Sequence, residues 1–273
     1  MKNQPIGFLD SGVGGLTVVK EVLKLLPNEQ IMYIGDSARN PYGPRPMKEV
    51  QKFTHQLAHF LVEQNIKLLV VACNTATVAA LKSLKDELPV PVIGVIAPGT
   101  YAAVLETKNN EIGVIGTVGT IASNEYEKQI LNEKADARVT SIATQEFVAI
   151  VEKNQFESQY AKGVVEQELE PFITTNIDTL VLGCTHYPLL QPIIQEFFGK
   201  EVTLIDPGVE TARVVERYLS EYDLLNQSLG ERSKHLFYTT GSAERFKEIA
   251  TNWLEVKNFD VMNVSIEELE KYV

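Results

Sequence analysis

The sequence predicts an α/β protein with two similar doubly wound domains, each built on a parallel sheet. Short runs rich in Val, Ile and Leu alternate with amphipathic helical patterns along the chain, which is typical of βαβ units. Most of these runs lack the polar–apolar alternation of half-exposed strands, so they should be buried on both faces. Two strand–turn segments also recur later in the chain in the same order, which indicates a repeated unit.

Nine apolar runs are expected to form the strands of these sheets. Helices should lie between them, as in residues 47–65, where apolar side chains three and four positions apart form one stripe. That stripe consists of Val50, Phe53, Leu57 and Leu61. In chain order, the expected strands are "PIGFL", "QIMYIG", "KLLVVA", "VPVIGV", "EIGVIG", "ARVTSIA", "DTLVLG", "EVTLID" and "HLFYTT".

The repeat indicates how the chain is divided into domains. "IGFLDSGVGG" at residue 6 resembles "IGVIGTVGTI" at residue 112, and "LLVVACNTATVAAL" at residue 68 resembles "TLVLGCTHYPLLQP" at residue 179. Chance likeness between buried strands would explain one match, but two matches in the same order favour duplication. We expect the two domains to be related by a pseudo-two-fold axis, with the active site in the cleft between them. The first domain should comprise residues 1–97 plus 207–273, and the second residues 98–206.

Composition and charge argue against several classes of partner. The chain has 273 residues, of which 44% are hydrophobic and 22% charged, enough for about two globular domains. Its net charge of −11 argues against broad contact with nucleic acid or an anionic membrane. No apolar run approaches the roughly 20 residues of a membrane span, and the N-terminus has no signal-peptide pattern. We therefore expect a cytoplasmic protein without nucleic-acid or membrane partners.

The two cysteines, Cys73 and Cys184, are the strongest candidates for catalysis. Each follows an apolar strand run and precedes a helical pattern, the place where open parallel sheets bind ligands. Asn74 and Thr185 follow the two thiols directly. If the repeated units face each other, one thiol can remove a proton from a carbon while the other delivers a proton to the opposite face. The helix N-terminus behind each thiol is expected to favour the thiolate.

Other interpretations of the cysteines and histidines are open. Either cysteine alone fits a small buried hydrophobe, and their matched positions favour function. The absence of C-x-x-C argues against a redox pair, and Cys184 with His186 lacks the further clustered ligands of a zinc site. His55 and His59 have i, i+4 spacing without the Glu of H-E-x-x-H, so a solvated or packed helix is the better interpretation. No metal site is expected.

Two loops complete the candidate site. In "FLDSGVGGLTVVKEV", closely spaced glycines can point backbone N–H groups at an anion, but their spacing is not the G-x-G-x-x-G of a dinucleotide site. Asp10 and Ser11 end the strand there, where they hold an ammonium or carboxylate group or merely cap the helix. In "YIGDSARNPYGPRP", proline and glycine should stiffen a loop that places Tyr42 and Gly43 at the mouth of the cleft.

Together, "DSGVGGLTV", "YIGDSARNPYG", "ACNTAT" and "LGCTHYPLL" resemble the motifs of the cofactor-independent aspartate/glutamate racemase family, from Ile6 to about Pro207. The resemblance implies an isomerase that interconverts L- and D-glutamate with Cys73 and Cys184 as the two bases, without metal or organic cofactor. It implies a role in supplying D-glutamate for bacterial peptidoglycan. It also implies that Asp10, His186 and Glu152 assist the thiols, although the residues around Glu152 differ from the family's pattern. Asp36 fits its motif, and a structural role is equally open for it. The substrate-binding residues so implied are Asp10, Ser11, Tyr42, Gly43, Asn74, Thr75, Thr117, Thr185 and His186.

Three alternatives to glutamate racemisation stay open at this point. The nearest is a racemase of aspartate or another amino acid. A two-domain protein that closes on a small acid without reacting is a second class, although it would not need two matched thiols. A nicotinamide oxidoreductase is third, and the irregular glycine spacing argues against it. We also expect a homodimer, and we expect the segment after Leu225 to return to the first domain.

Overall fold

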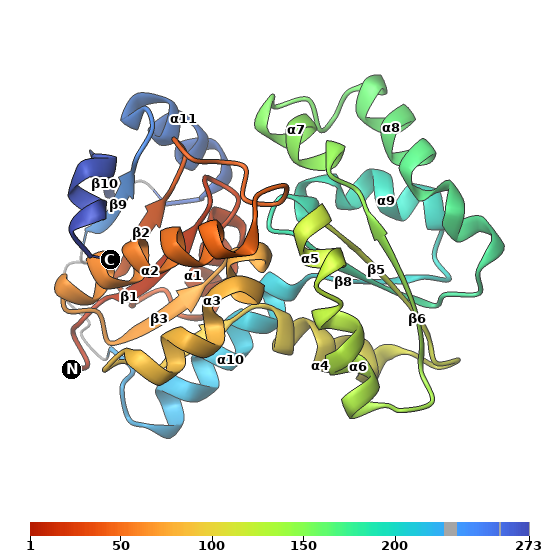
Figure 1. Cartoon of the computed structure of the whole chain (residues 1–273), viewed down its shortest axis with the longest axis horizontal. Helices are drawn as coiled ribbons and strands as arrows, with labels where there is room; N and C mark the ends of the chain where they lie inside the picture. The colour runs from red at the N-terminus through yellow and green to blue at the C-terminus, as the bar shows by residue number, and fades with distance from the viewer. Residues whose placement is uncertain (227–233, 257, 273) are drawn as a thin grey trace.

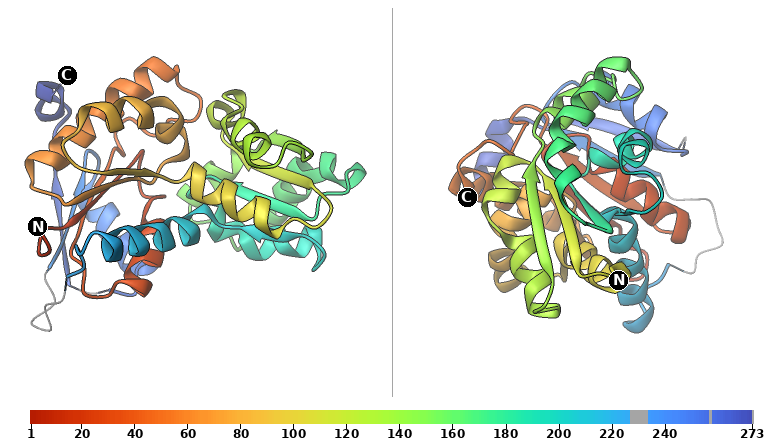
Figure 2. Two further views of the ribbon diagram at one scale, coloured as in Figure 1. Left: turned by 90° about the horizontal axis from the view of Figure 1, so that it is seen from below. Right: turned by 90° about the vertical axis from the view of Figure 1, so that its right-hand side faces the viewer.

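The chain folds into two lobes, each built around its own parallel sheet (Figure 1). The structure is a computed structural model, and it describes residues 1–226, 234–256 and 258–272. The left view of Figure 2 again shows the lobes side by side along the long axis of the molecule, and the right view looks along that axis. The predicted fold class, an α/β protein with parallel sheets, is therefore confirmed.

The first sheet, which we call sheet A, has strand order β10-β9-β2-β1-β3-β4 in the described residues. Every neighbouring pair is parallel. Ile6 lies opposite both Ile31 and Leu68, so the carboxyl ends of β1, β2 and β3 reach the same edge of the sheet. The strands are β1 (Ile6–Asp10), β2 (Ile31–Gly35), β3 (Leu68–Val71), β4 (Val92–Gly94), β9 (His235–Thr239) and β10 (Phe259–Asn263).

The second sheet, sheet B, has strand order β6-β5-β7-β8, again with parallel neighbours. This order repeats the β2-β1-β3-β4 part of sheet A. The two segment pairs matched in the sequence are β1 with β5 and β3 with β7, so each pair occupies the same place in its sheet. The strands are β5 (Glu111–Gly116), β6 (Arg138–Ala143), β7 (Thr179–Gly183) and β8 (Thr203–Ile205).

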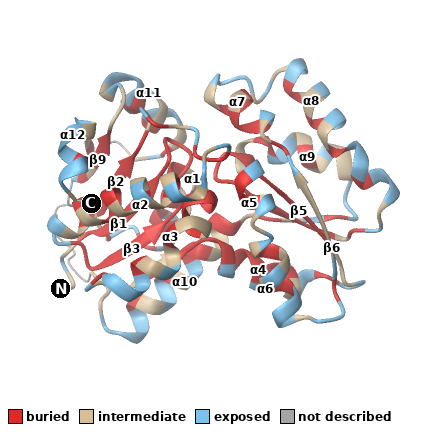
Figure 3. Cartoon of the chain, viewed as in Figure 1, coloured by how far each residue is buried: buried red, intermediate tan, exposed pale blue. Residues whose placement is uncertain are grey.

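Helices cover both faces of each sheet, as expected for strands rich in Val, Ile and Leu. On sheet A, one core is formed with α1, α10 and α11, and the other with α2, α3 and the C-terminal turns. The inner strands β1, β2 and β3 are buried, whereas the outer helix faces are exposed (Figure 3). In this lobe the helices are α1 (Leu16–Leu25), α2 (Met47–Glu63), α3 (Asn74–Glu87), α10 (Pro207–Glu221), α11 (Ala243–Trp253), α12 (Ile266–Leu269) and η3 (Glu270–Tyr272).

Sheet B is covered in the same way. Residues of α4 and α6 form one core, and residues of α7, α8 and α9 with the neighbouring 3₁₀ turns form the other. Within the described ranges, no helix combines the length and apolar character needed to cross a membrane. The helices are α4 (Ile96–Glu106), α5 (Val118–Ala122), α6 (Glu125–Glu133), α7 (Glu146–Glu152), α8 (Gln159–Leu169), η1 (Glu170–Thr174), η2 (Tyr187–Leu190) and α9 (Gln191–Phe198).

The path of the chain between the sheets bears on the expected domains. The strands of sheet A lie within 6–94 and 235–263, and those of sheet B within 111–205. The predicted boundary at 97/98 falls near the start of α4, and the boundary at 206/207 falls at the start of α10. Both boundaries stay predictions. The segment after Leu225 does return to the first lobe, where β9 pairs with β2 and β10 adds an edge strand.

Candidate active site

A small cavity lies where the carboxyl ends of strands from both sheets meet. Its volume is about 20 Å³, room for roughly one water molecule. Both cysteines line it, Cys73 from the first lobe and Cys184 from the second. The other lining residues are Ser11, Asn40, Pro41, Tyr42, Gly43, Asn74 and Thr75 from the first lobe and Thr117, Gln145, Val148, Thr185 and His186 from the second.

Most of the residues singled out from the sequence gather at this cavity. Asp10 and Glu152 do not line it, and they lie directly behind lining residues instead. Asp10 is fully buried, accepts the N–H of Gly12 at 3.0 Å, and receives a longer contact of 3.4 Å from the Thr185 hydroxyl across the lobe boundary. Burial raises the pKa of Asp10, although the charge of His186 and backbone N–H groups oppose the shift.

Cys73 caps the N-terminus of α3. Its sulfur accepts the backbone N–H of Ala76 at 3.4 Å and lies 3.9 Å from the Ser11 hydroxyl oxygen. Burial and then the negative charge of Asp10 raise the pKa of Cys73 to about 12, and the N–H of Ala76 only partly opposes them. The helix end does favour the thiolate of Cys73, as expected, but desolvation and the charge of Asp10 outweigh it, so the pKa is raised overall.

Cys184 directly follows β7, but no α-helix begins immediately after it. The N–H of Tyr187 bonds to the carbonyl of Cys184 at 3.1 Å, a three-residue spacing typical of a 3₁₀ turn. The 3₁₀ turn η2 comes first, and α9 begins only at Gln191. The helix predicted to start at Cys184 therefore starts later in the chain. The polar neighbour of the Cys184 thiol is a side chain instead, because Nδ1 of His186 lies 3.6 Å from the sulfur.

His186 connects the Cys184 thiol to Glu152. Nε2 of His186 lies 2.8 Å from Oε1 of Glu152. Burial opposes protonation, but the hydrogen bonds with Cys184 and Glu152 outweigh it and raise the pKa of His186 well above its usual value. Burial likewise acts to raise the pKa of Glu152, yet His186 lowers it overall. Two residues of the first lobe hold Glu152: Asn40 Nδ2 donates to its carboxylate at 3.2 Å, and Arg245 donates to its backbone carbonyl at 3.1 Å.

Hydrogen bonds join the two lobes all around the cavity. They involve groups that line it, such as the paired hydroxyls of Thr75 and Thr117, and groups just outside it. The bonds include Thr75 Oγ1 to Thr117 Oγ1 at 2.9 Å, Tyr126 Oη to Asn74 Oδ1 at 2.7 Å, Gly119 N to Gly43 O at 2.9 Å and Thr17 Oγ1 to Thr185 O at 2.9 Å. The cleft is therefore closed by direct contact between the lobes.

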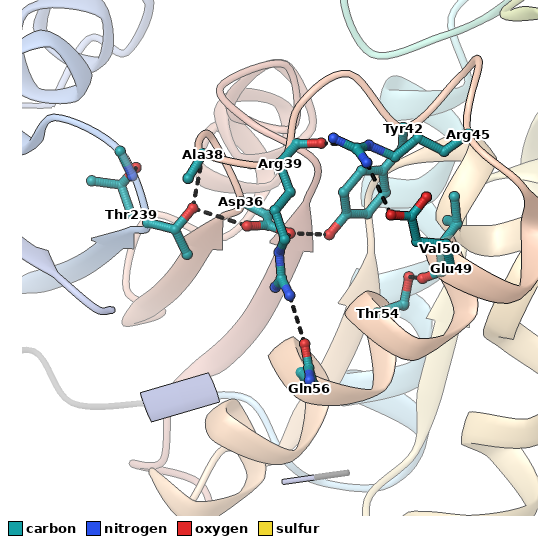
Figure 4. Close-up of polar contacts among 12 residues, drawn as sticks. Asp36, Ala38, Arg39, Tyr42, Arg45, Glu49, Val50, Thr54, Gln56 and Thr239 are labelled. Carbon is teal, nitrogen blue, oxygen red and sulfur yellow. Dashed lines mark hydrogen bonds and ion pairs between the residues drawn. The ribbon is translucent and has the colours of Figure 1, made fainter. Parts of the chain in front are cut away.

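A buried polar network holds the loop between β2 and α2 (Figure 4). The carboxylate of Asp36 is fully buried and accepts hydrogen bonds from Arg39 Nε at 2.7 Å, from Thr240 Oγ1 at 2.9 Å and from the Tyr42 hydroxyl. Arg39 also donates to Gln56 of α2 at 2.6 Å. The hydroxyl of Tyr42 thus points away from the cavity, and Asp36 anchors the loop rather than lining the site.

Sequence reasoning missed four lining residues. Asn40 and Pro41 immediately precede Tyr42 in the loop already noted for its rigidity, so the loop composition was a usable signal. Gln145 and Val148, at the start of α7, belong to no recognised motif. Only the three-dimensional arrangement places them opposite the first lobe, where Gln145 Oε1 also lies 3.4 Å from the backbone nitrogen of Val118.

The fold and the site together define a class of protein. A two-lobed α/β chain with one thiol from each lobe in a shared polar cavity is equipped to move protons on a small acid. Comparison with known proteins agrees: residues 6–215 match the Asp/Glu/Hydantoin racemase family. The chain belongs to this family, and it is a racemase, an isomerase enzyme.

Individual relatives are similar over nearly the whole chain. A glutamate racemase of a Carnobacterium strain is 53% identical over 267 residues, which is 97% of this chain and 100% of the relative. A solved glutamate racemase isoform from Bacillus anthracis superposes with a TM-score of 0.93 at 46% identity, covering 97% of this chain and 99% of that one. A glutamate racemase from Francisella tularensis, solved in complex with D-glutamate, superposes with a TM-score of 0.91 at 35% identity, covering 100% of both chains.

Proposed function

We propose that this protein is a glutamate racemase that interconverts L- and D-glutamate with two cysteine bases. One observation carries the proposal: Cys73 and Cys184 come from different lobes and line one closed cavity whose other polar groups are hydroxyls, amides and an imidazole. The relatives support the choice of glutamate, because they are similar over nearly the full chain and one was solved with D-glutamate.

The reaction removes one proton and adds one. The thiolate of one cysteine takes the α-proton from one face of the substrate, and the electron pair of the broken C–H bond spreads into the adjacent carboxylate. The thiol of the other cysteine gives its proton to the opposite face and becomes the thiolate. The configuration inverts, the two sulfurs exchange protonation states, and nothing is oxidised or reduced.

The residues around the thiols suit the charge that develops in this step. An α-proton is a very weak acid unless the carboxylate that receives the charge meets oriented donors in a dry cavity. Neutral donors do this without adding a competing charge. In this proposal, the substrate carboxylates are held by Ser11, Asn74, Thr75, Thr117 and Thr185, all of which line the cavity.

The two thiols receive different help. Cys73 lies near Asp10, and together with burial that carboxylate disfavours the thiolate. The α-ammonium group of a bound amino acid would oppose both effects, so the substrate helps to activate the base that attacks it. His186, paired with Glu152, is placed to give a proton to Cys184 or to accept one from it.

Several further features belong to this proposal. Catalysis uses no metal ion and no organic cofactor, because thiols and neutral donors supply every part of the step. We infer that the D-glutamate formed is used for bacterial peptidoglycan, and that the enzyme acts in the cytoplasm, a reducing compartment in which its two free thiols persist. We also infer a homodimer, which sedimentation velocity would test.

Activity assays separate glutamate racemisation from its alternatives. Dialysed and chelator-treated protein is incubated with each enantiomer of glutamate and of aspartate, and optical rotation is followed. We expect racemisation of glutamate, with aspartate slower because one methylene in a pocket is worth roughly 1–3 kcal/mol. Equal kcat/KM for the two acids would contradict the specificity. Activity that returned only with zinc or pyridoxal phosphate would contradict the cofactor-free mechanism.

Exchange in deuterated water tests the two-thiol mechanism itself. By resemblance to the family, Cys73 takes the proton from D-glutamate and Cys184 from L-glutamate. Either Cys→Ser change should lower racemisation by orders of magnitude, because a hydroxyl is a far weaker acid than a thiol. Cys184→Ser should still exchange the α-proton of D-glutamate faster than that of L-glutamate, and Cys73→Ser should show the reverse preference. The same preference in both variants, or undiminished racemisation in either, would show that the mechanism is wrong.

A further inference from the structure

A cluster far from the cavity brings together three side chains that commonly bind metals. His55 and His59 lie one turn apart on α2, and Glu87 is the last residue of the neighbouring helix α3. Nδ1 of His55 lies 3.1 Å from one carboxylate oxygen of Glu87, and Nε2 of His59 lies 2.8 Å from the other. One ligand atom from each residue falls within 4.8 Å of the others. The sequence motif gave no sign of this, because Glu87 comes from a separate helix.

Ser83 lies between His55 and the backbone of α3. With the Ser83 hydroxyl donating to the carbonyl of Ala80 at 3.0 Å, its oxygen accepts at the 2.7 Å contact with His55 Nε2. In this tautomer, Nε2 carries the hydrogen, and a neutral His55 presents the Nδ1 lone pair to the carboxylate of Glu87. Two acceptors 3.1 Å apart repel each other unless a proton or a metal cation lies between them.

We propose that His55, His59 and Glu87 form a binding site for a late first-row divalent cation, with Zn²⁺ as the leading candidate. Two imidazoles and one carboxylate are a common zinc donor set that leaves a position open for water. Ser83 fixes the orientation of one imidazole, as outer partners of metal-bound histidines generally do. Mg²⁺ and Ca²⁺ prefer oxygen ligands, so this site should discriminate against them.

Such an ion would link α2 to α3 and would take no part in the reaction. The helix α3 begins at Asn74, next to Cys73, and ends at Glu87. At a rise of 1.5 Å per residue, the site lies about 20 Å from the thiol. The ion should therefore stabilise the folded protein by mass action, and the metal-free enzyme should keep its full activity. This proposal stands or falls separately from the proposed racemisation.

Calorimetry and thermal unfolding test the site on the full, tag-free chain. Metal-stripped protein is titrated with ZnCl₂, NiCl₂ and MgCl₂, and Tm is measured with and without each ion. We expect one Zn²⁺ or Ni²⁺ per chain at this site, a higher Tm with either ion, and no effect of Mg²⁺. His59→Gln should remove the binding and the gain in Tm, while Ser83→Ala should weaken binding about tenfold.

The neighbouring acid supplies the matched control. Asp86→Asn removes an exposed carboxylate next to Glu87 without touching the proposed ligands, and it should bind Zn²⁺ normally. Glu87→Gln provides a second ligand variant, and the Tm of each metal-free variant shows whether it is folded. Undetectable binding of Zn²⁺ and Ni²⁺ would overturn the proposal. So would binding that persists in both His59→Gln and Glu87→Gln but disappears in Cys184→Ser, because the ion would then be at the catalytic thiols.

Discussion

Cys73 and Cys184 occupy matching places in the two sheets but have unlike neighbours. Cys73 is surrounded by a helix terminus, a serine and, behind them, the buried carboxylate of Asp10. Cys184 faces an imidazole that is held by Glu152. The likeness of the two sequence segments revealed the matching places. It showed His186 beside Cys184, but it could not reveal the roles of Asp10 and Glu152, which come from other parts of the chain, nor the burial, which is a property of the whole fold.

The pH dependence of catalysis should reflect the raised pKa of Cys73. If Cys73 must hold a proton to donate it, kcat/KM should fall on the alkaline side well above the value of about 8.5 for an ordinary thiol, since this pKa lies at about 12. The charge of Asp10 is the second largest cause of the shift, so Asp10→Asn should move the alkaline limb to lower pH. The measurement is kcat/KM against pH. At each pH, kcat/KM must be the same for L-glutamate and D-glutamate, because the two enantiomers have equal free energy.

Unfolding must be measured over the same pH range as kcat/KM. A thiol whose pKa is raised by folding stabilises the protein fully below the unfolded value near 8.5, and this contribution is lost as pH rises towards about 12. Circular dichroism at each pH separates a loss of activity caused by ionisation of Cys73 from one caused by unfolding. Asp206→Asn is the control, because Asp206 is another acid that burial affects, with a pKa raised to about 6, but it caps α10 outside the cavity. An alkaline limb near 8.5, or one unmoved by Asp10→Asn, would contradict this account of Cys73.

At the scale of elements, the loop between β2 and α2 shows how the C-terminal part of the chain serves the site. Thr240, just after β9, bonds to Asp36, and Asp36 holds the Tyr42 hydroxyl. Gly43 follows directly and bonds to Gly119 of the second lobe. The loop that lines the cavity is thus fixed from one side by the C-terminal segment and from the other by the opposite lobe.

Removing the Tyr42 hydroxyl should loosen this loop. A buried hydrogen bond to a charged group is worth about 1.5–3 kcal/mol, so Tyr42→Phe should lower the free energy of unfolding by that order. Because Tyr42 and Gly43 line the cavity, KM for glutamate should rise more than kcat falls. Thr54→Val is the control: it deletes a buried hydroxyl of α2, which donates to the carbonyl of Val50 at 2.7 Å within the same helix (Figure 4). Kinetics that Tyr42→Phe leaves unchanged, or that Thr54→Val alters equally, would show that the network does not position the loop.

The secondary structure was largely predictable from the sequence, and the exceptions have physical reasons. All nine expected strands are present as β1 to β9, because apolar runs bounded by turn residues are a strong local signal. The strand β10 was missed: it is an edge strand in "FDVMN", mostly half-buried or exposed, and carries no apolar run. The anchoring of Tyr42 was also beyond local pattern, since Asp36 and Thr240 lie 204 residues apart.

At the scale of the molecule, one buried ion pair connects segments of the first lobe that are far apart in the sequence. Lys67, just before β3, lies 2.5 Å from the carboxylate of Glu29, and its ammonium group also donates to the carbonyls of Lys2 and Leu224. The side chains of Lys67 and Glu29 are only 1% and 2% exposed. The pair therefore connects the N-terminus, the turn before β2, the start of β3 and the segment after α10.

Removing one partner of this ion pair should destabilise the fold, whereas replacing both partners with apolar residues should destabilise it much less. Glu29→Gln leaves a buried ammonium without its counter-charge, which should lower the free energy of unfolding by about 3–5 kcal/mol, whereas Lys67→Met with Glu29→Leu should recover most of the loss. Urea titration measures both. As control, Glu196→Gln removes the partner of the exposed pair Lys162–Glu196 and should lower the free energy of unfolding far less, because water and salt screen exposed pairs. A similar small loss for Glu29→Gln would contradict the structural role of the buried pair.

The closed cleft requires movement during turnover. A cavity of about 20 Å³ has space for one water molecule, so we expect the lobes to separate to admit glutamate. The sequence predicted a site between two domains, but the closure depends on side-chain hydrogen bonds across the boundary, such as Thr75 with Thr117, whose partners no local pattern identifies. A probe of the boundary would therefore report on the catalytic cycle.

Trp253, the only tryptophan of the chain, is placed to be that probe. It lies at the end of α11, which packs against α1, and its side chain packs against the hydrophobic cores of both lobes. When the lobes separate, Trp253 should lose contacts and become more accessible to water. A bound glutamate contacts both lobes and shifts the population towards the closed form, so saturating D- or L-glutamate should reduce quenching of Trp253 fluorescence by acrylamide.

The effect should appear over the same substrate concentrations that saturate the rate. The control moves the probe: Trp253→Phe combined with Tyr222→Trp places the tryptophan at an exposed position just after α10, where glutamate should not alter quenching. Because Trp253 does not line the cavity of the two thiols, this double variant should retain activity. Quenching of Trp253 that stays constant while the rate saturates would mean that the lobes do not move as units, and that glutamate is admitted by local motion of the loop around Tyr42 instead.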